Sequence, residues 1–326
     1  MLPTIYILAQ DTVGASGVAG PIDIFHTANL ILKNIVGEDA EQIKWKIVGL
    51  NKGDVRSAAG MIFKSDMTLD QLVEPGWIYL PGFVVENETE LLTYLESNRA
   101  LLDKLKKLYS SGFSLASNCT GAFLLAESGI LDGKSATTTW WLEDFFQKRY
   151  PKVDLDINNL IVENDRTICS ATAMAHMELA TYLVEKLLGG KCAHLCRKYL
   201  LMENGKKTQT PFRRLANAKD DGFIQSANRY LLEHLGEELR IDELADFLAV
   251  SNRTLSRRFK ESTGDSPLQH IQKLRIERSK YLLETSNLPA TEIMQRVGYQ
   301  DSSSFGQVFK RFTGLTPGQY RQKFCA

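Results

Sequence analysis

Short apolar runs alternate with amphipathic segments over the N-terminal part of the chain, up to Gly190. The runs are rich in Ile, Val, Leu and aromatic residues, which is typical of buried strands. We expect strands at Pro3–Ala9, Lys44–Leu50, Trp77–Leu80 and Phe113–Ala116. We expect helices at Ile22–Leu32, Glu88–Tyr109, Thr120–Ser128 and Ala173–Leu188. This alternation predicts an α/β domain with a mostly parallel sheet covered on both faces.

The pattern changes towards the C-terminus. Residues 203–220 lose hydrophobic periodicity and gain Gly, Pro and basic residues, as linkers do. From Gly222 onward the pattern is helical throughout, and four apolar residues fall on one helix face: Ile241, Leu244, Ala245 and Leu248. A length of 326 residues also favours two domains. We expect an N-terminal domain over residues 1–200, a linker over 201–220 and an all-α domain over 221–326.

A nine-residue sequence motif occurs twice in the helical part. Phe259–Pro267 reads FKESTGDSP, and Phe309–Pro317 reads FKRFTGLTP, with five of the nine positions identical. Each copy follows a short helical pattern and a turn, so the repeated unit is a supersecondary element. Two such units side by side are typical of a protein that reads DNA twice.

Each unit has the pattern of a helix-turn-helix. In the first, a helix from Ile241 ends near Val250, and Ser251 can cap the second helix, Asn252–Ser262. In the second unit the cap is Asp301 or Ser302. A continuous helix from Pro267 to Leu283 joins the units. If it held two recognition helices ~34 Å apart, they would enter successive major grooves of one duplex.

The outward faces of the two second helices carry the candidate DNA contacts. Arg253 and Arg257, at i and i+4, are able to reach guanine edges from one face. A solvated basic helical bundle is the alternative interpretation, and the duplication with its caps favours a DNA reader. The full candidate set is Arg253, Ser256, Arg257, Lys260, Ser302, Ser303, Gln307 and Lys310.

The net charge of zero hides a segregation of charge. Residues 251–326 hold 13 Lys and Arg against 6 Asp and Glu, whereas residues 221–250 hold 2 against 7. The basic residues therefore lie in the repeated elements, where phosphate contacts need them. The overall charge does not exclude DNA binding.

The helical part resembles the AraC/XylS family of transcription regulators from Phe223 to Phe324. The match includes Gly298-Tyr299-x-Asp301-x-Ser303-x-Phe305 and Gly314-Leu315-Thr316-Pro317-x-x-Tyr320-Arg321. The resemblance implies sequence-specific promoter binding, usually as an activator that contacts RNA polymerase, although some relatives repress.

Residues Phe113 to Phe123 predict a strand, a sharp turn and a helix, with Cys119 at the turn. Such an elbow presents a nucleophile above a sheet, and a helix N-terminus favours the thiolate and so lowers a thiol pKa. Here Ser117 replaces the first glycine of the G-x-S-x-G pattern. The downstream stretch Gly133–Trp140 offers no base for catalysis.

The N-terminal part resembles the ThiJ/PfpI domain, related to class I glutamine amidotransferases, in the arrangement found in GlxA-like regulators. The resemblance spans Pro3 to about Gly190 and implies a flavodoxin-like fold. It rests on Gly20–Phe25, Tyr79–Gly82, Ser117–Ala122, Gly133–Trp140 and Cys169–Ala171. Relatives often carry histidine where this chain has Thr139, and enzymatic relatives place a glutamate near Asp23. Both departures weaken hydrolytic chemistry, since a hydroxyl of high pKa is no general base and Asp reaches less far than Glu.

Cys119 has three interpretations. It lies at the floor of a ligand site, because strand C-termini are where α/β domains bind small molecules; or it is a redox or electrophile sensor; or it serves catalysis or packing. Asp23 either helps to hold a cationic ligand or caps its helix. The candidate ligand-binding residues are Asp23, Cys119, Thr120, Thr139 and Trp140.

The five cysteines are odd in number and scattered, so we expect reduced thiols. The stretch Cys192-Ala193-His194-Leu195-Cys196 lacks the spacing of a zinc knuckle, and we expect no metal and no cofactor. No apolar run is long enough to span a membrane, and the start has no signal-peptide pattern, so we expect a cytoplasmic protein.

We therefore expect a regulator that binds promoter DNA, acts as an activator, dimerises through its N-terminal domain and responds to a small molecule. The effector class suggested by regulators of this kind is an amino acid or a betaine-like amine, which an aromatic wall suits. One alternative is a cysteine-dependent amidase or glyoxalase fused to a DNA-binding domain. Another is a module whose N-terminal half binds only a protein.

Overall fold

The structure, a computed structural model, describes all residues except 1, 38, 203–207, 211–221, 238 and 325–326. It divides into two compact units, Met1–Gln209 and Thr210–Ala326. The division falls inside the expected linker 201–220, most of which lies outside the described residues.

The first unit is built on a seven-stranded sheet in the order β10-β11-β7-β6-β1-β2-β5. All neighbouring strands in it are parallel except β10 and β11. Two further pairs, β3 with β4 and β8 with β9, lie outside this sheet. The strands are β1 (Ile5–Leu8), β2 (Trp45–Gly49), β3 (Gly53–Arg56), β4 (Ile62–Ser65), β5 (Met67–Thr68), β6 (Trp77–Leu80), β7 (Ser114–Asn118), β8 (Ser135–Ala136), β9 (Asp154–Leu155), β10 (Ile161–Asn164) and β11 (Thr167–Ser170).

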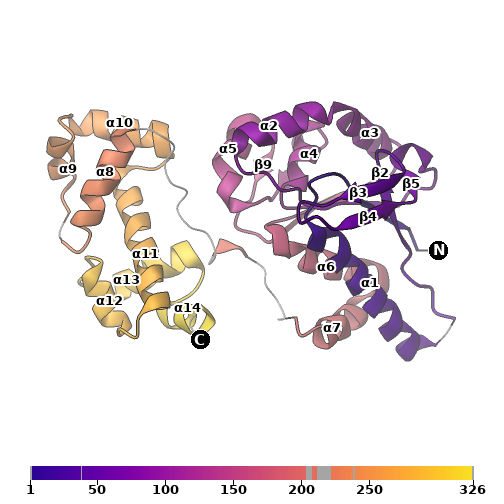
Figure 1. The fold of residues 1–326 in the computed structure, drawn as a ribbon. Coiled ribbons are helices and arrows are strands. Elements are labelled where there is room, and N and C mark those ends of the chain that lie inside the picture. The colour runs from indigo at the N-terminus through magenta and orange to yellow at the C-terminus, as the bar shows by residue number, and fades with distance from the viewer. Residues whose placement is uncertain (1, 38, 203–207, 211–221, 238, 325–326) are drawn as a thin grey trace. The chain divides into compact units, whose positions relative to one another are not determined.

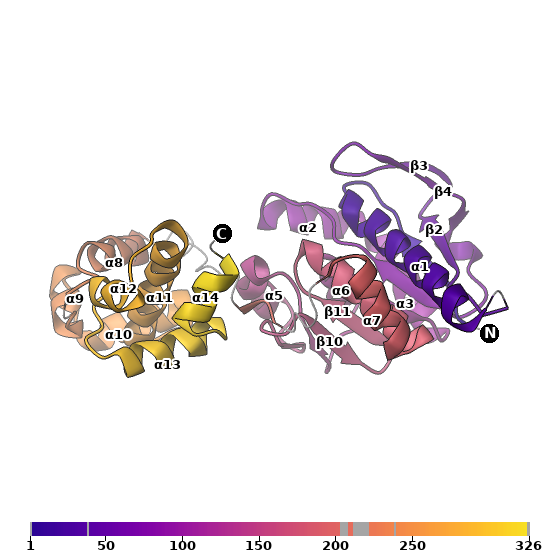
Figure 2. The same cartoon turned by 90° about the horizontal axis from the view of Figure 1, so that it is seen from below.

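Helices cover both faces of the sheet, as Figure 1 shows. One face carries α1 (Ala15–Val36), α6 (His176–Leu188) and α7 (Gly190–Tyr199), which pack against one another and lie side by side in Figure 2. The other face carries α2 (Glu88–Ser97), α3 (Arg99–Ser110), α4 (Gly121–Glu127) and α5 (Glu143–Arg149). The expected α/β fold class is confirmed.

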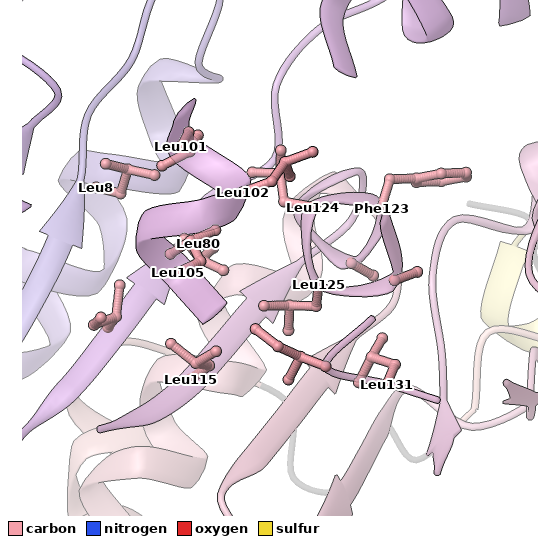
Figure 3. Packing of buried hydrophobic residues seen from close by; sticks show 14 of the residues in the cluster. Leu8, Leu80, Leu101, Leu102, Leu105, Leu115, Phe123, Leu124, Leu125 and Leu131 are labelled. Atoms are coloured by element: carbon pink, nitrogen blue, oxygen red, sulfur yellow. The ribbon is translucent and has the colours of Figure 1, made fainter. Parts of the chain in front are cut away.

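Alternate residues of the central strands point to the two faces, as the period of two in a strand requires. Leu8, Leu80 and Leu115 enter the core under α3 and α4, whereas Ile7 and Tyr79 enter the core under α1 and α6. Figure 3 shows the first of these cores, where leucines of three neighbouring strands meet those of α3 and α4.

The helix bounds differ from the expectation in two places. The run Glu88–Tyr109 is two helices that meet at Asn98, whose backbone (φ −106°, ψ 23°) is not helical. Helix α1 begins at Ala15 rather than Ile22, with Pro21 inside it. The sequence pattern favours a helix that starts at Pro21, because the first turn of a helix does not need the N–H that proline lacks. Helix α1 instead runs through Pro21 and goes without the hydrogen bond that an N–H at this position would donate to the Gly17 carbonyl.

Helices are the only regular elements among the described residues of the second unit. Figure 1 shows α11 running between the helices before it and the helices after it. Its helices are α8 (Gly222–Glu233), α9 (Ile241–Phe247), α10 (Asn252–Thr263), α11 (Pro267–Thr285), α12 (Ala290–Arg296), α13 (Ser302–Thr313) and α14 (Pro317–Phe324). Each half has its own apolar core, one around Leu255 and Phe259 and the other around Phe305 and Phe309.

Arg275 of α11 ties the two halves of this unit together. Its guanidinium donates to the carbonyl of Glu237 at 2.8 Å and to that of Gly298 at 3.0 Å, and it lies over the ring of Tyr299. Gly298 has φ of 82°, and a Cβ there would lie 2.6 Å from both Arg275 Nη2 and the Leu235 carbonyl oxygen. Glycine is therefore required where the halves meet, and the halves are fixed by this contact as well as by α11.

Candidate functional site

Cys119 lies at the turn between β7 and α4, where the sequence predicts an elbow. Its φ is 53°, a left-handed conformation that is strained for a residue with a side chain. The turn is held from both sides, because Cys119 N–H donates to the Ser170 carbonyl at 3.0 Å and the Thr138 hydroxyl donates to the Cys119 carbonyl at 2.9 Å. The surrounding structure thus keeps the strained residue in place.

Glycine at position 82 lets β6 approach the elbow closely. A Cβ on Gly82 would lie 2.9 Å from Cβ of Cys119, which is closer than side chains come. The Gly82 carbonyl also accepts a 2.8 Å hydrogen bond from Gly14 N–H, just before α1. Three segments, namely the starts of α1 and α4 and the end of β6, therefore meet around Cys119.

Threonine hydroxyls surround the thiol. Thr120 is hydrogen-bonded twice to the backbone of Phe83, donating to its carbonyl at 2.7 Å and accepting from its N–H at 2.8 Å. Thr139 is fully buried, and its hydroxyl has no hydrogen-bonding partner among the described residues apart from its approach to the thiol of Cys119. A buried hydroxyl without a firm partner is the kind of group that a ligand satisfies.

The expectation of a lowered thiol pKa at Cys119 is wrong. The side chain is only 5% exposed, and burial raises the pKa of the Cys119 thiol to about 11, outweighing hydrogen bonds from Thr120 and Thr139 that lower it. Desolvation disfavours the thiolate more than the start of the short helix α4 favours it. The resting protein therefore holds a thiol rather than a thiolate at this position.

Of the other candidate ligand residues, Trp140 is next to Thr139 in the sequence, whereas Asp23 lies further along α1. Trp140 follows Thr139 directly, is half-buried and meets the exposed Trp141 edge to face, with ring centroids 5.4 Å apart. Asp23 is exposed on α1, ~9 Å along the helix from Gly17, which packs on Pro81 next to the elbow. Asp23 does not cap α1 either, since the cap residue is Gly14.

The cysteines of α7 pack against α1. The thiols of Cys192 and Cys196 lie 3.5 and 3.7 Å from the carbonyl oxygens of Ala28 and Ile24 and are buried. Within the described residues, no group of three or more His, Cys, Asp and Glu residues is arranged to hold a metal ion.

The second unit contains two helix pairs of the same design. In the first, α9 is followed by a turn in which Ala249 has φ of 53°, and the Ser251 hydroxyl caps α10 by accepting from Thr254 N–H. In the second, α12 leads to the Gly298 turn, and Asp301, rather than Ser302, caps α13 by accepting from Ser304 N–H at 2.6 Å. Both second helices end at a left-handed glycine, Gly264 or Gly314.

Helices α10 and α13 bury one face and expose the other. Leu255 and Phe259 of α10 and Phe305 and Phe309 of α13 are buried in the two cores. The candidate DNA contacts are all exposed: Arg253, Ser256, Arg257, Lys260, Ser302, Ser303, Gln307 and Lys310. Among the described residues, each of the two helices therefore exposes a mixed basic and polar face.

An α/β unit with a cysteine elbow, joined to a unit with two helix-turn-helix pairs, defines a two-domain protein of the DNA-binding class. The model of the DJ-1/PfpI family matches residues 3–186, and the model of a helix-turn-helix domain matches residues 244–323. The chain belongs to the DJ-1/PfpI family. Its C-terminal part carries a helix-turn-helix domain of the AraC type, which confirms both expected resemblances.

Similar proteins share both parts. The HTH-type transcriptional regulator CdhR of Pseudomonas aeruginosa is 27% identical over 289 residues, which are 86% of this chain and 82% of that protein. The HTH-type transcriptional regulator GbdR of the same species is 22% identical over 289 residues, 86% of this chain and 76% of that protein. A third, the HTH-type transcriptional regulator ArgR of Pseudomonas aeruginosa, is 27% identical over 67% of each chain.

Solved structures resemble the N-terminal fold. DJ-1beta of Drosophila melanogaster has a TM-score of 0.50 at 19% identity, covering 62% of this chain and 100% of that one. A ThiJ/PfpI family protein from Pseudomonas syringae has a TM-score of 0.51 at 18% identity, covering 76% and 91%. These likenesses show a flavodoxin-like fold. None of the described helices is long and apolar enough to cross a membrane.

Proposed function

We propose that this protein is a sequence-specific DNA-binding transcription regulator whose N-terminal domain senses a small molecule. The observation that carries the proposal is the repeated, capped helix pair with an exposed polar and basic face on α10 and on α13. The similarity to HTH-type transcriptional regulators over 86% of the chain supports it.

In this proposal α10 and α13 enter two major grooves of promoter DNA. Arg253 and Arg257 of α10 read guanine edges, while Ser302, Ser303 and Gln307 of α13 read bases by neutral hydrogen bonds. Lys260 and Lys310 lie near the ends of the two helices and contact phosphate, as does Ser256. The two helices thus bind different half-sites, and α10 makes the contact with more basic side chains.

The effector site that we propose is formed around the Cys119 elbow. Thr120 shapes the turn, Thr139 offers an unsatisfied hydroxyl, and Trp140 offers an aromatic face suited to a cationic amine such as an amino acid or a betaine. Asp23, exposed further along α1, is left out of this site. We assign sensing and dimerisation to residues 1–200, joined by the linker 201–220 to the DNA-binding domain, 221–326.

Two further partners belong to the proposal. A dimer brings two readers together and raises their effective concentration on DNA. As an activator the protein contacts RNA polymerase, a role inferred from the AraC-type domain alone.

The DNA half of the proposal is tested by selecting genomic fragments on the full-length protein and footprinting the enriched sites. We expect a protected region with two segments about 10 base pairs apart on one face of the duplex. The Arg253→Ala, Arg257→Ala double variant, which keeps both cores, is expected to enrich nothing. Enrichment without sequence preference in the wild type contradicts the proposal.

The sensor half is tested by thermal-shift screening against amino acids, betaines, polyamines and aldehydes. A ligand at about 100 times its Kd adds about 2.7 kcal/mol of stability, which raises the unfolding midpoint measurably. A Thr139→Val variant keeps the shape of the side chain and is expected to lose the shift. A blank screen favours an N-terminal half that binds a protein.

The strained φ of Cys119 favours one other candidate, a cysteine-dependent amidase or glyoxalase activity. Against it stands the raised pKa of the thiol, with hydroxyls rather than a base among its neighbours. Turnover of a simple amide or aldehyde that disappears in Cys119→Ala would establish the enzyme.

A further inference from the structure

Gln209, the last residue of the first unit, has its side chain buried in that unit. It is 1% exposed, and its amide nitrogen donates to the Ile157 carbonyl at 2.7 Å and to the Thr138 carbonyl at 2.9 Å. The backbone is held as well, since Gln209 N–H donates to the Asn158 carbonyl at 3.1 Å. The chain thus leaves the first unit from a polar anchor rather than from the end of a helix.

Thr138 links this anchor to the elbow. Its hydroxyl donates to the Cys119 carbonyl at 2.9 Å, while its own carbonyl accepts from Gln209. One residue therefore contacts both the strained turn and the anchor. Its neighbour Thr139 approaches the thiol of Cys119, so a group that enters beside the thiol has to displace the same short segment.

The anchor is not fully satisfied. The amide oxygen of Gln209 is buried and has no hydrogen-bonding partner among the described residues. A buried acceptor without a donor favours release to water, which opposes the four hydrogen bonds that hold the residue in place, the fourth being a 3.5 Å bond from the amide nitrogen to the Thr137 hydroxyl. A movement of Thr138 would break one of these hydrogen bonds in a residue that already lacks one.

We propose that Gln209 couples the Cys119 site to the linker: occupation or modification of the thiol moves Thr138 and Thr139 and releases Gln209 from its seat. The coupling rests on the proposed sensor function, and it specifies how the Cys119 site would affect the linker. The coupling is reciprocal, as any coupling between two sites must be. Loosening the anchor must therefore expose the thiol, and filling the thiol site must loosen the anchor.

The first arm of the test measures how the anchor affects the thiol. N-ethylmaleimide is reacted with the full-length protein at pH 8, and modification of Cys119 is followed by mass spectrometry of its peptide. We expect Gln209→Ala and Gln209→Glu to raise the rate at least fivefold over wild type. The matched control is Thr208→Val, which removes the hydroxyl that donates to the Asn158 carbonyl at 2.6 Å without touching Thr138.

The second arm measures the reverse effect in the wild-type protein. The sequence places trypsin-cleavable residues Lys207 and Arg213 on either side of the anchor. Alkylation of Cys119 is expected to raise the rate of cleavage there at least threefold, and Cys119→Ala treated in the same way is expected to show no change. This arm uses only natural Gln209, so it stands even if the Gln209 variants fold poorly.

Equal alkylation rates in wild type and Gln209→Ala, or a Thr208→Val rate raised as much as theirs, would overturn the coupling through Gln209. So would cleavage that alkylation leaves unchanged. Neither arm requires DNA or a natural effector. A failure to bind DNA in the selection experiment would therefore contradict the proposed DNA-binding function. The alkylation and cleavage rates would still test the coupling through Gln209.

Discussion

Arg257 and Glu261 form an ion pair one turn apart on α10, with Arg257 Nη1 3.0 Å from both carboxylate oxygens. Both side chains are largely exposed, at 60% and 59%. Such a pair contributes at most about 1 kcal/mol and exchanges readily for stronger partners. The guanidinium is therefore oriented in the free protein and available to a guanine edge.

Arg257→Ala is expected to weaken binding to a selected site by ~1–3 kcal/mol and to relax preference at one base pair. The matched control is Arg258→Ala on the same helix, whose guanidinium lies over the Phe223 ring instead of on the reading face. Affinities are measured by fluorescence anisotropy at fixed salt. Equal losses in both variants would remove Arg257 from the reading face.

Glu261→Gln is expected to act in the opposite direction. It frees Arg257 from its partner and removes a negative charge from the DNA-facing helix, so affinity should rise by up to about 1 kcal/mol. The gain should shrink as salt is raised, because it is electrostatic. A loss of affinity would mean that Glu261 orients Arg257 more than it competes with DNA.

Lys310→Ala is expected to weaken binding to all sequences about equally. If Lys310 contacts one phosphate, the slope of log affinity against log salt becomes shallower by about 0.9. Titrations over several salt concentrations measure that slope. A change in sequence preference with an unchanged slope would place Lys310 at a base instead.

Cys119 should react slowly at neutral pH. With the thiol pKa raised to about 11 by burial, only about one molecule in ten thousand carries the thiolate at pH 7. The alkylation rate should therefore rise about tenfold per pH unit up to pH 9 or beyond, as a rate per thiolate predicts. A rate that levels off near pH 7 would point to a low-pKa sensor thiol and contradict the structure.

His270 is expected to make the helical unit sensitive to acid. Its Nε2 lies 2.7 Å from Asn228 Oδ1, its Nδ1 is buried without a partner among the described residues, and burial lowers its pKa from 6.5. Nearby, Asp265 raises this pKa and Lys273 lowers it. The unfolded chain therefore binds the proton more readily, so stability present above pH 6.5 is lost as the pH falls below it.

Hydrogen exchange of peptides from α8 and α11 is expected to show this loss between pH 7 and pH 5, after correction for intrinsic rates. His270→Gln, which keeps a donor for Asn228, is expected to reduce it. Identical losses in wild type and variant would assign the acid sensitivity to other groups.

The sequence predicts the repeated unit well because caps and buried aromatics recur at a fixed offset, as Ser251 and Asp301 illustrate. It also places Cys119 at its turn. It does not predict how deeply the thiol is buried, since burial depends on Gly82 and on segments far apart in the chain. The sequence does not predict that Gln209 is buried, because a polar residue within a linker pattern is expected to be exposed. Its burial depends on hydrogen bonds to the carbonyls of Thr138 and Ile157, which lie far away in the sequence.

The Arg275 contact restricts the DNA sites that the protein is able to bind. Because α11 and Arg275 join the two helix pairs, we expect the distance and angle between the two reading helices to change little on DNA. One inserted base pair turns the second half-site by about 34–36° around the duplex axis. Target promoters can drift in base sequence at a modest loss of affinity, whereas their half-site spacing is expected to stay constant, and spacing is the property by which they are best searched for.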